Sequence, residues 1–149
     1  MKNAKQTNEM KMVIPSLSVN EGVARSVIAA FCAQLNPTAV DIADIKCAVS
    51  EAITNCIVHG YKDLIGNIYI SVKIFEDGLV KINIRDKGCG ISDVKQARQP
   101  LFTTEAEGER SGMGFTVMES FMDKLSVSST VGKGTSVTMS KRLNNIHIN

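Results

Sequence analysis

Two side chains in the stretch 50–61, SEAITNCIVHGY, have the types and the spacing for metal-dependent or acid–base chemistry. Glu51 and Asn55 stand four residues apart, so in a helix they line up one turn apart on the same face. The carboxylate could act as a general base, and the carboxamide oxygen could be a ligand for a hard metal ion. The same spacing occurs on ordinary solvated helix faces, so the pair needs support from other parts of the chain.

Asp86 opens the first of three glycine clusters, Asp86-Lys87-Gly88-Cys89-Gly90, at the expected end of a strand. Glycines at this point let the backbone come close to a flat ligand. The carboxylate of Asp86 can accept a hydrogen bond from an exocyclic amine such as that of adenine. A plain turn that is capped by the aspartate is the alternative, and the sequence leaves both open.

The other two clusters have the composition of an anion site and of a turn. Gly112-Met113-Gly114 stands just before an expected helix, whose unpaired backbone N–H groups favour an anion. Arg110 and Ser111 lie beside it as candidate phosphate ligands. The third cluster is Gly132-Lys133-Gly134-Thr135, and Thr135 could share a hydrogen bond or a water with the aspartate of the first cluster if their strands are neighbours.

Several common motifs are absent from the sequence. The first cluster lacks the third glycine of the dinucleotide-binding fingerprint, and the third cluster is not a P-loop. There is no nucleophile elbow and no HExxH. His59 and His147 are too few and too far apart for a histidine metal site, and His59 suits a helix-end cap or a packed residue better than a catalyst.

The composition excludes several classes of protein. A length of 149 residues suits one domain with a core, and a net charge of +2 is too small to make nucleic acid the main partner. The polar start is no signal peptide, and no apolar run approaches the ~18 residues of a membrane span. The four cysteines form no CxxC pair, which favours buried free thiols in a reducing compartment. We therefore expect a cytoplasmic protein without a membrane partner.

The hydrophobic pattern predicts a long helix followed by a hairpin of strands. The helix spans about 38–59, and Gly60 fits a left-handed helix end. Its apolar stripe is formed by Ile42, Ile45, Val49, Ile53, Cys56 and Ile57. Apolar and polar residues alternate over 67–75 and 79–86, with a turn at 76–78 between them. One apolar and one polar face per strand predict an α/β two-layer sandwich, in which a mixed, mainly antiparallel sheet carries helices on one face.

The remaining segments complete a single domain over 11–142. Residues 1–10 are expected to be a flexible tail, and residues 143–149 to be frayed. The other expected elements are a strand at Lys11–Pro15, a helix from Ser18 or Asn20 to about Leu35, a long loop at 87–114, a helix at 115–122, and strands at 124–129 and 135–141.

The expected helix that ends near Leu35 has one face that is unusual for a surface helix. Its expected core stripe holds Val23, Ala24, Val27, Ile28, Phe31 and Leu35, and its opposite face holds Gly22, Arg25, Ala29, Cys32 and Ala33. That opposite face has one charge and several small residues. It is either buried on both sides within the monomer or a protein-docking face on which Arg25 is an anchor.

The order of these motifs resembles a known ATP-binding fold. ExxxN on a helix, DxGxG after a strand, a long loop, GxG before a helix and GT on a strand follow one another in the fold shared by gyrase, Hsp90, histidine kinases and MutL. Within that superfamily, SEAITNCIVHGY, IRDKGCGI, RQPLFTT and ERSGMGF resemble the anti-sigma serine kinases of Gram-positive bacteria. The resemblance covers about residues 10–142.

The resemblance implies a role for each motif residue. Asn55 would coordinate the Mg²⁺ that bridges the nucleotide phosphates, and Glu51 would be the catalytic base. Asp86 would bind adenine, with Gly88 and Gly90 packed against the base.

The loop at about 92–113 corresponds to the ATP lid of the family. Within and after it, the resemblance implies nucleotide or phosphate contacts for Thr103, Thr104, Arg110, Ser111, Gly112, Met113 and Gly114. Thr135 corresponds to the threonine that supports the adenine-binding aspartate and the purine. The implied cofactors are ATP or ADP, together with Mg²⁺.

The activity that the resemblance implies is that of an anti-sigma factor which is also an ATP-dependent protein serine kinase. In the family, a homodimer holds a sporulation sigma factor of the sigma F type away from RNA polymerase. It inactivates an anti-anti-sigma protein by phosphorylating it on serine, and no direct contact with nucleic acid is implied. Two alternatives stay open: a non-catalytic, nucleotide-gated module that only binds the sigma factor, and a detached histidine-kinase-like ATPase domain.

Overall fold

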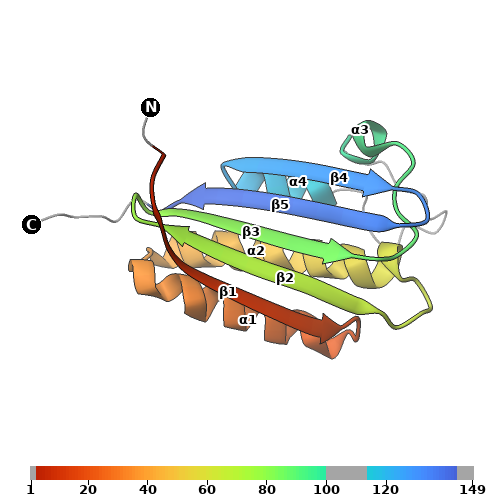
Figure 1. Cartoon of the computed structure of the whole chain (residues 1–149), viewed down its shortest axis with the longest axis horizontal. Helices are drawn as coiled ribbons and strands as arrows, with labels where there is room; N and C mark the ends of the chain where they lie inside the picture. The colour runs from red at the N-terminus through yellow and green to blue at the C-terminus, as the bar shows by residue number, and fades with distance from the viewer. Residues whose placement is uncertain (1–2, 100–113, 144–149) are drawn as a thin grey trace, which may run out of the picture.

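A five-stranded sheet with helices on one face forms the body of the molecule (Figure 1). The computed structural model describes residues 3–99 and 114–143. The strands are β1 (Gln6–Pro15), β2 (Asn67–Phe75), β3 (Leu79–Asp86), β4 (Lys124–Thr130) and β5 (Gly134–Arg142). They lie in the order β1-β2-β3-β5-β4, and every neighbouring pair is antiparallel. The expected two-layer α/β fold with helices on one face is confirmed, but the five strands form an antiparallel sheet and not a mixed one.

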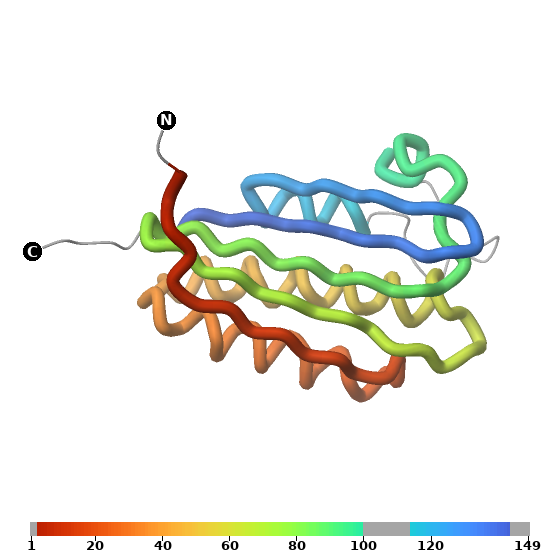
Figure 2. Tube along the Cα trace, viewed as in Figure 1, coloured from red at the N-terminus to blue at the C-terminus, as the bar shows by residue number. Residues whose placement is uncertain are grey.

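Helices α1 (Val19–Cys32), α2 (Ala39–Asn55) and α4 (Gly114–Phe121) form the second layer, behind the sheet in the view of Figure 2. The core lies between the two layers, because alternate residues of the central strands are apolar and point to the helices. These residues, each at most 3% exposed, are Ile68, Ile70, Val72, Ile74, Val80, Ile82 and Ile84. The alternation in the sequence therefore predicted both the strands and the face that they bury.

A short helix, α3 (Val94–Ala97), lies apart from this layer, beside β4 (Figure 1). It falls inside the stretch that was expected to be a long loop. The side chain of Asp93 accepts a hydrogen bond from the backbone N–H of Gln96 at 3.0 Å and caps its N-terminus. No helix in the described ranges 3–99 and 114–143 has both the length and the apolar character to cross a membrane.

The N-terminus of α2 agrees with the sequence prediction, but its C-terminus does not. The Thr38 side chain accepts a hydrogen bond from the N–H of Asp41, and the Asp41 side chain accepts one from the N–H of Thr38, which is a capping box. A π-helical turn, η2 (Cys56–Gly60), extends the helix. The expected left-handed conformation at Gly60 is wrong, because the positive φ of this region falls on Lys62, at 54°.

The expected tail at residues 1–10 is wrong for residues 6–10, because β1 begins at Gln6 and not at Lys11. Residues 6–9 are polar and Met10 alone is apolar, so the sequence does not reveal this stretch as a strand. They are ordered by pairing with β2, in which Met10 lies opposite Val72 and Gln6 opposite Phe75. An edge strand needs no apolar outer face, which explains why pattern reasoning missed it.

The expected division of α1 into two faces is also partly wrong. A short 3-10 turn, η1 (Ala33–Leu35), ends the span that was expected to be one helix. Ala29 and Cys32 are buried, although they were assigned to the outer face, and Val23 of the expected core stripe is 46% exposed. The cause is that α1 packs against α2 as well as against the sheet, so its buried surface includes small residues at the contact between the helices.

Candidate functional site

Glu51 and Asn55 lie on α2 and face the first residue of α4. A methyl group added at Gly114 would lie 3.2 Å from both Nδ2 and Oδ1 of Asn55 and 3.5 Å from Oε2 of Glu51. The start of α4 therefore approaches both side chains closely because residue 114 has no side chain. The structure brings together three predicted site residues that come from two motifs far apart in the sequence.

Asp86, the last residue of β3, is a buried carboxylate with 4% of its surface exposed. Burial raises its pKa, while hydrogen bonds from the N–H of Gly88, the thiol of Cys56 and the backbone of Thr135 lower it. The bond from the Gly88 N–H to Oδ1 measures 2.9 Å. Because two carboxylate oxygens offer about four acceptor positions, Asp86 can accept a further bond from a ligand amine.

Glycines surround Asp86 because side chains would displace it. A methyl group at Gly60 would lie 2.8 Å from Oδ2 of Asp86, and one at Gly134 would overlap the carbonyl oxygen of Asp86. A methyl group at Gly88 would overlap the carbonyl oxygen of Gly60. Gly60 is therefore required for the close packing of η2 on β3 and not for a left-handed helix end.

Gly90 has its own structural reason. Its φ is 77°, and a methyl group there would overlap the carbonyl oxygen of Thr130 in the β4–β5 hairpin. The backbone of this position thus needs glycine whether or not a ligand is bound. The contact of Gly88 and Gly90 with a purine stays a prediction.

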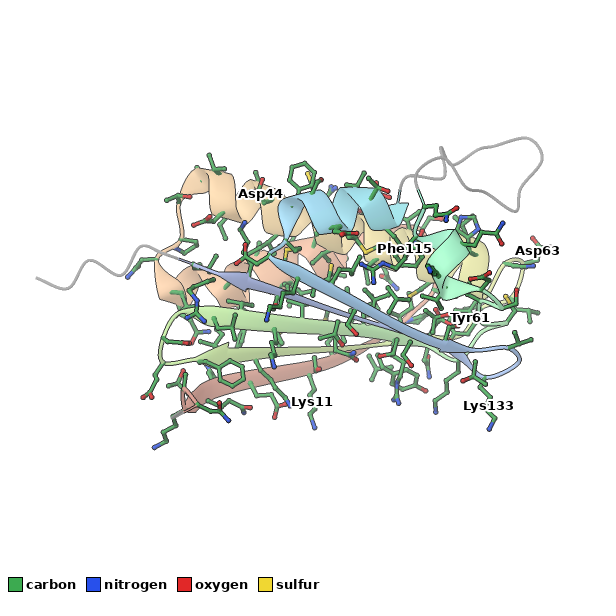
Figure 3. All side chains as sticks on the ribbon, turned by 90° about the horizontal axis from the view of Figure 1, so that it is seen from above. Lys11, Asp44, Tyr61, Asp63, Phe115 and Lys133 are labelled. Carbon is green, nitrogen blue, oxygen red and sulfur yellow. The ribbon has the colours of Figure 1, made fainter. Side chains whose placement is uncertain are left out.

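Hydrogen bonds tie the loop after β3 to the end of η2. The backbone N–H of Cys89 donates to the carbonyl oxygen of Gly60 at 2.9 Å. The hydroxyl of the buried Tyr61 accepts a bond from the N–H of Lys87 at 2.7 Å. Tyr61 and Phe115, the second residue of α4, lie toward the same end of the molecule (Figure 3). The two hydrogen bonds, from Cys89 to Gly60 and from Lys87 to Tyr61, hold the end of β3 against the turn that extends α2.

Thr135 lies directly opposite Asp86 in the β3–β5 ladder. The proximity of the two strands, on which the prediction for Thr135 depended, is therefore confirmed. The backbone of Thr135 hydrogen-bonds to the carboxylate of Asp86. Its Oγ1 lies 2.8 Å from Oγ of Ser129, which also accepts the N–H of Ile91 at 2.7 Å. The support of a purine by Thr135 stays a prediction.

Three residues at this site were missed by sequence reasoning: Cys56, Tyr61 and Ser129. Cys56 was assigned only to the apolar stripe of the helix, yet its thiol contacts Asp86. Its position four residues before Gly60 was a usable signal, because such residues share a helix face. Ser129 reaches the site across the β4–β5 ladder, and no local pattern could have shown that contact.

The expectation that the thiols are buried is confirmed for two cysteines and wrong for the other two. Cys32 and Cys56 are buried, whereas Cys47 and Cys89 are exposed, and all four are free. Cys89 lies on the loop beside Asp86, and its thiol donates to the carbonyl oxygen of His59 at 3.1 Å. Cys47 lies on the solvent side of α2, next to the apolar stripe but outside it.

Arg25 lies on α1, with 45% of its side chain exposed, and pairs with Glu21 at 3.3 Å. The interpretation that this face of α1 is buried on both sides within the monomer is therefore wrong for Arg25. Its role as a docking anchor stays a prediction. Six other predicted site residues lie outside the described residues: Thr103, Thr104, Arg110, Ser111, Gly112 and Met113.

Comparisons with known proteins agree with this geometry. Residues 14–141 match the histidine kinase-like ATPase domain family. The chain is 57% identical over 136 residues to an anti-sigma F factor of Thermoanaerobacter sp. (strain X514), covering 91% of this chain and 94% of the relative. It is 53% identical over 137 residues to an anti-sigma F factor of Bacillus licheniformis, and this match covers 91% of this chain and 93% of the relative.

A solved structure has the same fold. It is a crystal structure of the RsbU and RsbW domains of a Mycobacterium tuberculosis protein, with a TM-score of 0.67 and 21% sequence identity. The match covers 92% of this chain and 32% of that longer chain. At this identity the similarity supports the two-layer architecture alone.

Proposed function

The chain belongs to the histidine kinase-like ATPase domain family and to the anti-sigma F factors within it, and from this premise we propose that it is an anti-sigma factor with protein serine kinase activity. It holds a sigma factor of the sigma F type and uses ATP to phosphorylate an anti-anti-sigma protein on serine. One observation carries the proposal: a buried carboxylate in a glycine frame adjoins a helix whose Glu51 and Asn55 face the start of α4.

The residues present suit an adenine nucleotide. Asp86 is a buried acceptor with capacity for the exocyclic amine, and Gly60 and Gly88 leave no side chain over it. Asn55 offers a carboxamide oxygen of the type that Mg²⁺ accepts. The N-terminus of α4 lies beside Asn55, and the partial positive charge of a helix N-terminus favours phosphate.

The reaction that we propose is a phosphoryl transfer to a serine hydroxyl. The hydroxyl oxygen of the substrate bonds to the γ-phosphorus of ATP, the bond from that phosphorus to the bridging oxygen breaks, and ADP leaves. Glu51 takes the hydroxyl proton. Asn55 would hold Mg²⁺, which would neutralise charge on the phosphates. Such a reaction depends mainly on positioning and charge stabilisation, so few protein groups suffice.

Replacing the base tests the kinase part of the proposal. Glu51→Gln keeps the size of the side chain but removes its basicity, so we expect the rate of serine phosphorylation to fall by roughly 10²-fold or more. The affinity for ATP should change by less than about twofold, because the base is not needed for binding. The assay follows phosphate on the anti-anti-sigma protein, and calorimetry follows ATP. Glu119→Gln, which removes an exposed carboxylate from α4, is the matched control.

The same assay separates the two alternatives. A non-catalytic module would bind ATP and the sigma factor but would leave the antagonist unmodified in the wild type as well. A histidine-kinase-like domain would place acid-labile phosphate on histidine instead of acid-stable phosphate on serine. A Glu51→Gln protein that phosphorylates serine at the wild-type rate would disprove the assignment of the base.

Replacing the metal ligand tests the role of Mg²⁺. We expect Asn55→Ala to weaken ATP binding by roughly tenfold or more in Mg²⁺, because a ligand to a charged group is lost. In EDTA the variant and the wild type should bind ATP alike. Asn83→Ala is the control, since Asn83 bonds Ser136 and Thr138 on the outer face of the sheet. An equal loss in Mg²⁺ and in EDTA would contradict the metal role.

The partners follow from the same premise. We propose a homodimer in the cytoplasm, supported by the long edge strand β1 and by exposed apolar side chains near it. These side chains are Val13, Leu17, Val19 and Val23, between 41% and 72% exposed. Arg25 on the exposed side of α1 is the proposed docking anchor for a protein partner, because an accessible arginine among small residues suits a protein interface.

A further inference from the structure

We infer that the outer face of the sheet, which points away from the helix layer, is a docking surface for an acidic segment of a partner protein. The surface is centred on β2 and β3, where every second residue points away from the core. Asp86 of the nucleotide site is buried on the other side of the sheet. Binding of ATP and docking of an acidic segment are therefore separate properties of the chain.

The outer face is positively charged because lysine and arginine gather on it. Glu9 and Asp86 are the carboxylates of the five strands, and Glu9 is the one that lies on the outer face. The cations of the outer face are Lys11, Lys73, Lys81, Arg85 and Lys124 on the strands, Lys87 directly after β3, and Lys133 on the β4–β5 turn (Figure 3). Within residues 3–99 and 114–143, no carboxylate lies within ion-pair distance of any of them.

Two of these cations face each other on neighbouring strands. Lys73 lies directly opposite Lys81 in the β2–β3 ladder. Like charges at directly opposed positions destabilise a sheet. Glu9 lies opposite Lys73 on the β1 side, but the described part of the chain shows no ion pair between them. An anionic group between the two ammonium groups would remove the repulsion, so the pair suits ligand binding better than it suits the stability of the fold.

The aromatic side chains of the outer face hold cations. Tyr69 and Phe75 are the aromatic residues of the five strands. The guanidinium of Arg85 lies 4.9 Å from the ring centroid of Tyr69, and Nζ of Lys87 lies 4.8 Å from it. Nζ of Lys81 lies 5.8 Å from the ring centroid of Phe75. RNA that binds to a sheet stacks its bases on exposed aromatic rings. Because cations lie over both rings, this face offers charge without a stacking surface, which favours an acidic peptide over RNA.

A row of short polar side chains lies between the two ends of the charged surface. Asn83 lies opposite Ser71 of β2 on one side and Thr138 of β5 on the other. Its Nδ2 donates to Oγ1 of Thr138 at 3.0 Å and to Oγ of Ser136 at 2.9 Å. A hydroxyl that accepts a hydrogen bond can still donate its own hydrogen. The row therefore offers donors to carboxylates and leaves room for a peptide backbone above it.

The spacing of the cations suits an extended peptide. Lys81 and Arg85 stand four residues apart on β3, which corresponds to about 13 Å along a strand. Carboxylates that stand four residues apart in an extended peptide have the same separation. One such segment, laid along β3, would pair with both cations.

The test is fluorescence polarisation with the whole chain in low salt. The probe is a labelled peptide of about twelve residues in which glutamate and serine alternate. We expect Lys73→Gln combined with Lys81→Gln to weaken the binding of this peptide by roughly three- to tenfold, the size for two partly screened ion pairs. Lys46→Gln combined with Lys95→Gln removes the same charge from exposed positions of α2 and α3 and should change the affinity by less than about twofold.

A second pair of substitutions makes the test independent of one contact. Lys73→Gln combined with Arg85→Gln keeps Lys81 over Phe75 and should weaken the peptide to a similar extent. The midpoint of urea unfolding should not fall in Lys73→Gln combined with Lys81→Gln, because a repulsion is removed. A merely structural role of the two lysines would instead lower stability and affinity together. Calorimetry should show unchanged ATP binding in these variants.

Equal losses in the outer-face variants and in the control would overturn the inference, because binding would then follow net charge alone. The same peptide with glutamine in place of glutamate should bind at least roughly tenfold more weakly, and equal binding would also overturn it. Tighter binding of a uridine RNA of the same length, or of phosphatidylserine vesicles, would assign the surface to another class of partner. A wild type that does not bind the acidic peptide would refute the docking surface. A wild type that binds the peptide but not ATP would refute the proposed function and leave the docking surface intact.

Discussion

Burial separates the four thiols of this chain into two chemical classes. Burial raises the pKa of Cys32 to about 12 and that of Cys56 well above the usual range for a thiol. The thiolate, and not the thiol, is the nucleophile. Cys47 and Cys89 are exposed, so reagents in solution reach them.

At the residue scale we predict selective alkylation. Iodoacetamide at about pH 8 should modify Cys47 and Cys89 in the folded chain, whereas Cys32 and Cys56 should react only after the chain is unfolded in urea. Mass spectrometry of the peptides measures each site separately. Alkylation of Cys56 in the folded chain at the rate of Cys89 would contradict the buried contact with Asp86.

At the scale of elements, the turn η2 decides how close the long helix comes to the sheet. Its contact with β3 depends on a missing side chain, because Gly60 faces the carboxylate of Asp86. Gly22 of α1 offers the opposite situation, since a methyl group there would meet only Arg25, at 3.8 Å. The two glycines therefore form a matched pair for one substitution.

We predict that alanine has opposite effects at these two positions. Gly60→Ala should lower the free energy of unfolding by about 1–2 kcal/mol through overpacking and should weaken ATP binding more than roughly tenfold, because Asp86 must move. Gly22→Ala should raise the free energy of unfolding by about 0.5–1 kcal/mol and leave ATP binding unchanged. Urea unfolding and calorimetry measure the two effects. Undisturbed ATP binding in Gly60→Ala would contradict the placement of Asp86 in the site.

At the scale of the whole molecule, the outer face of the sheet is strongly basic. Lys11 and Lys133 point away from the helix layer (Figure 3), and Lys73 lies directly opposite Lys81 across β2 and β3. The cations of this face without a carboxylate within ion-pair distance among the described residues are Lys11, Lys73, Lys81, Arg85, Lys87, Lys124 and Lys133. Two such faces repel each other, so self-association through the outer face is unfavourable. The exposed apolar side chains near the β1 edge are the better candidate for a dimer contact.

We predict that charge near this edge weakens the dimer. The double substitution Val19→Lys and Val23→Lys should shift the molecular mass in solution from dimer to monomer at about 10 μM, because burying a lysine at an interface costs more than burying a valine. Light scattering after size exclusion measures the mass, and circular dichroism checks the fold. Val131→Lys, on an exposed turn at the far end of β4, is the control. A doubly substituted chain that stays dimeric would exclude this surface.

Local patterns were sufficient for much of the fold. The alternation over 67–75 and 79–86 predicted the hairpin and its buried face, because neighbouring residues alone set that period. The capping residue and the apolar stripe of α2 are local features as well, because each depends only on residues close together in the sequence. The polar start of β1 was not predictable, because its order comes from pairing with β2 and not from its own composition.

The sequence by itself determined which groups are available for chemistry: Glu51 and Asn55 on one helix face, Asp86 at a strand end, and glycines beside them. Only the tertiary structure decided which of these groups meet. It placed Gly114 against Asn55, Thr135 opposite Asp86, and the thiol of an apparently structural cysteine on the carboxylate. The physical reason is that residue spacing governs contacts within one element, whereas contacts between elements depend on how helix and sheet pack, which no short stretch of sequence encodes.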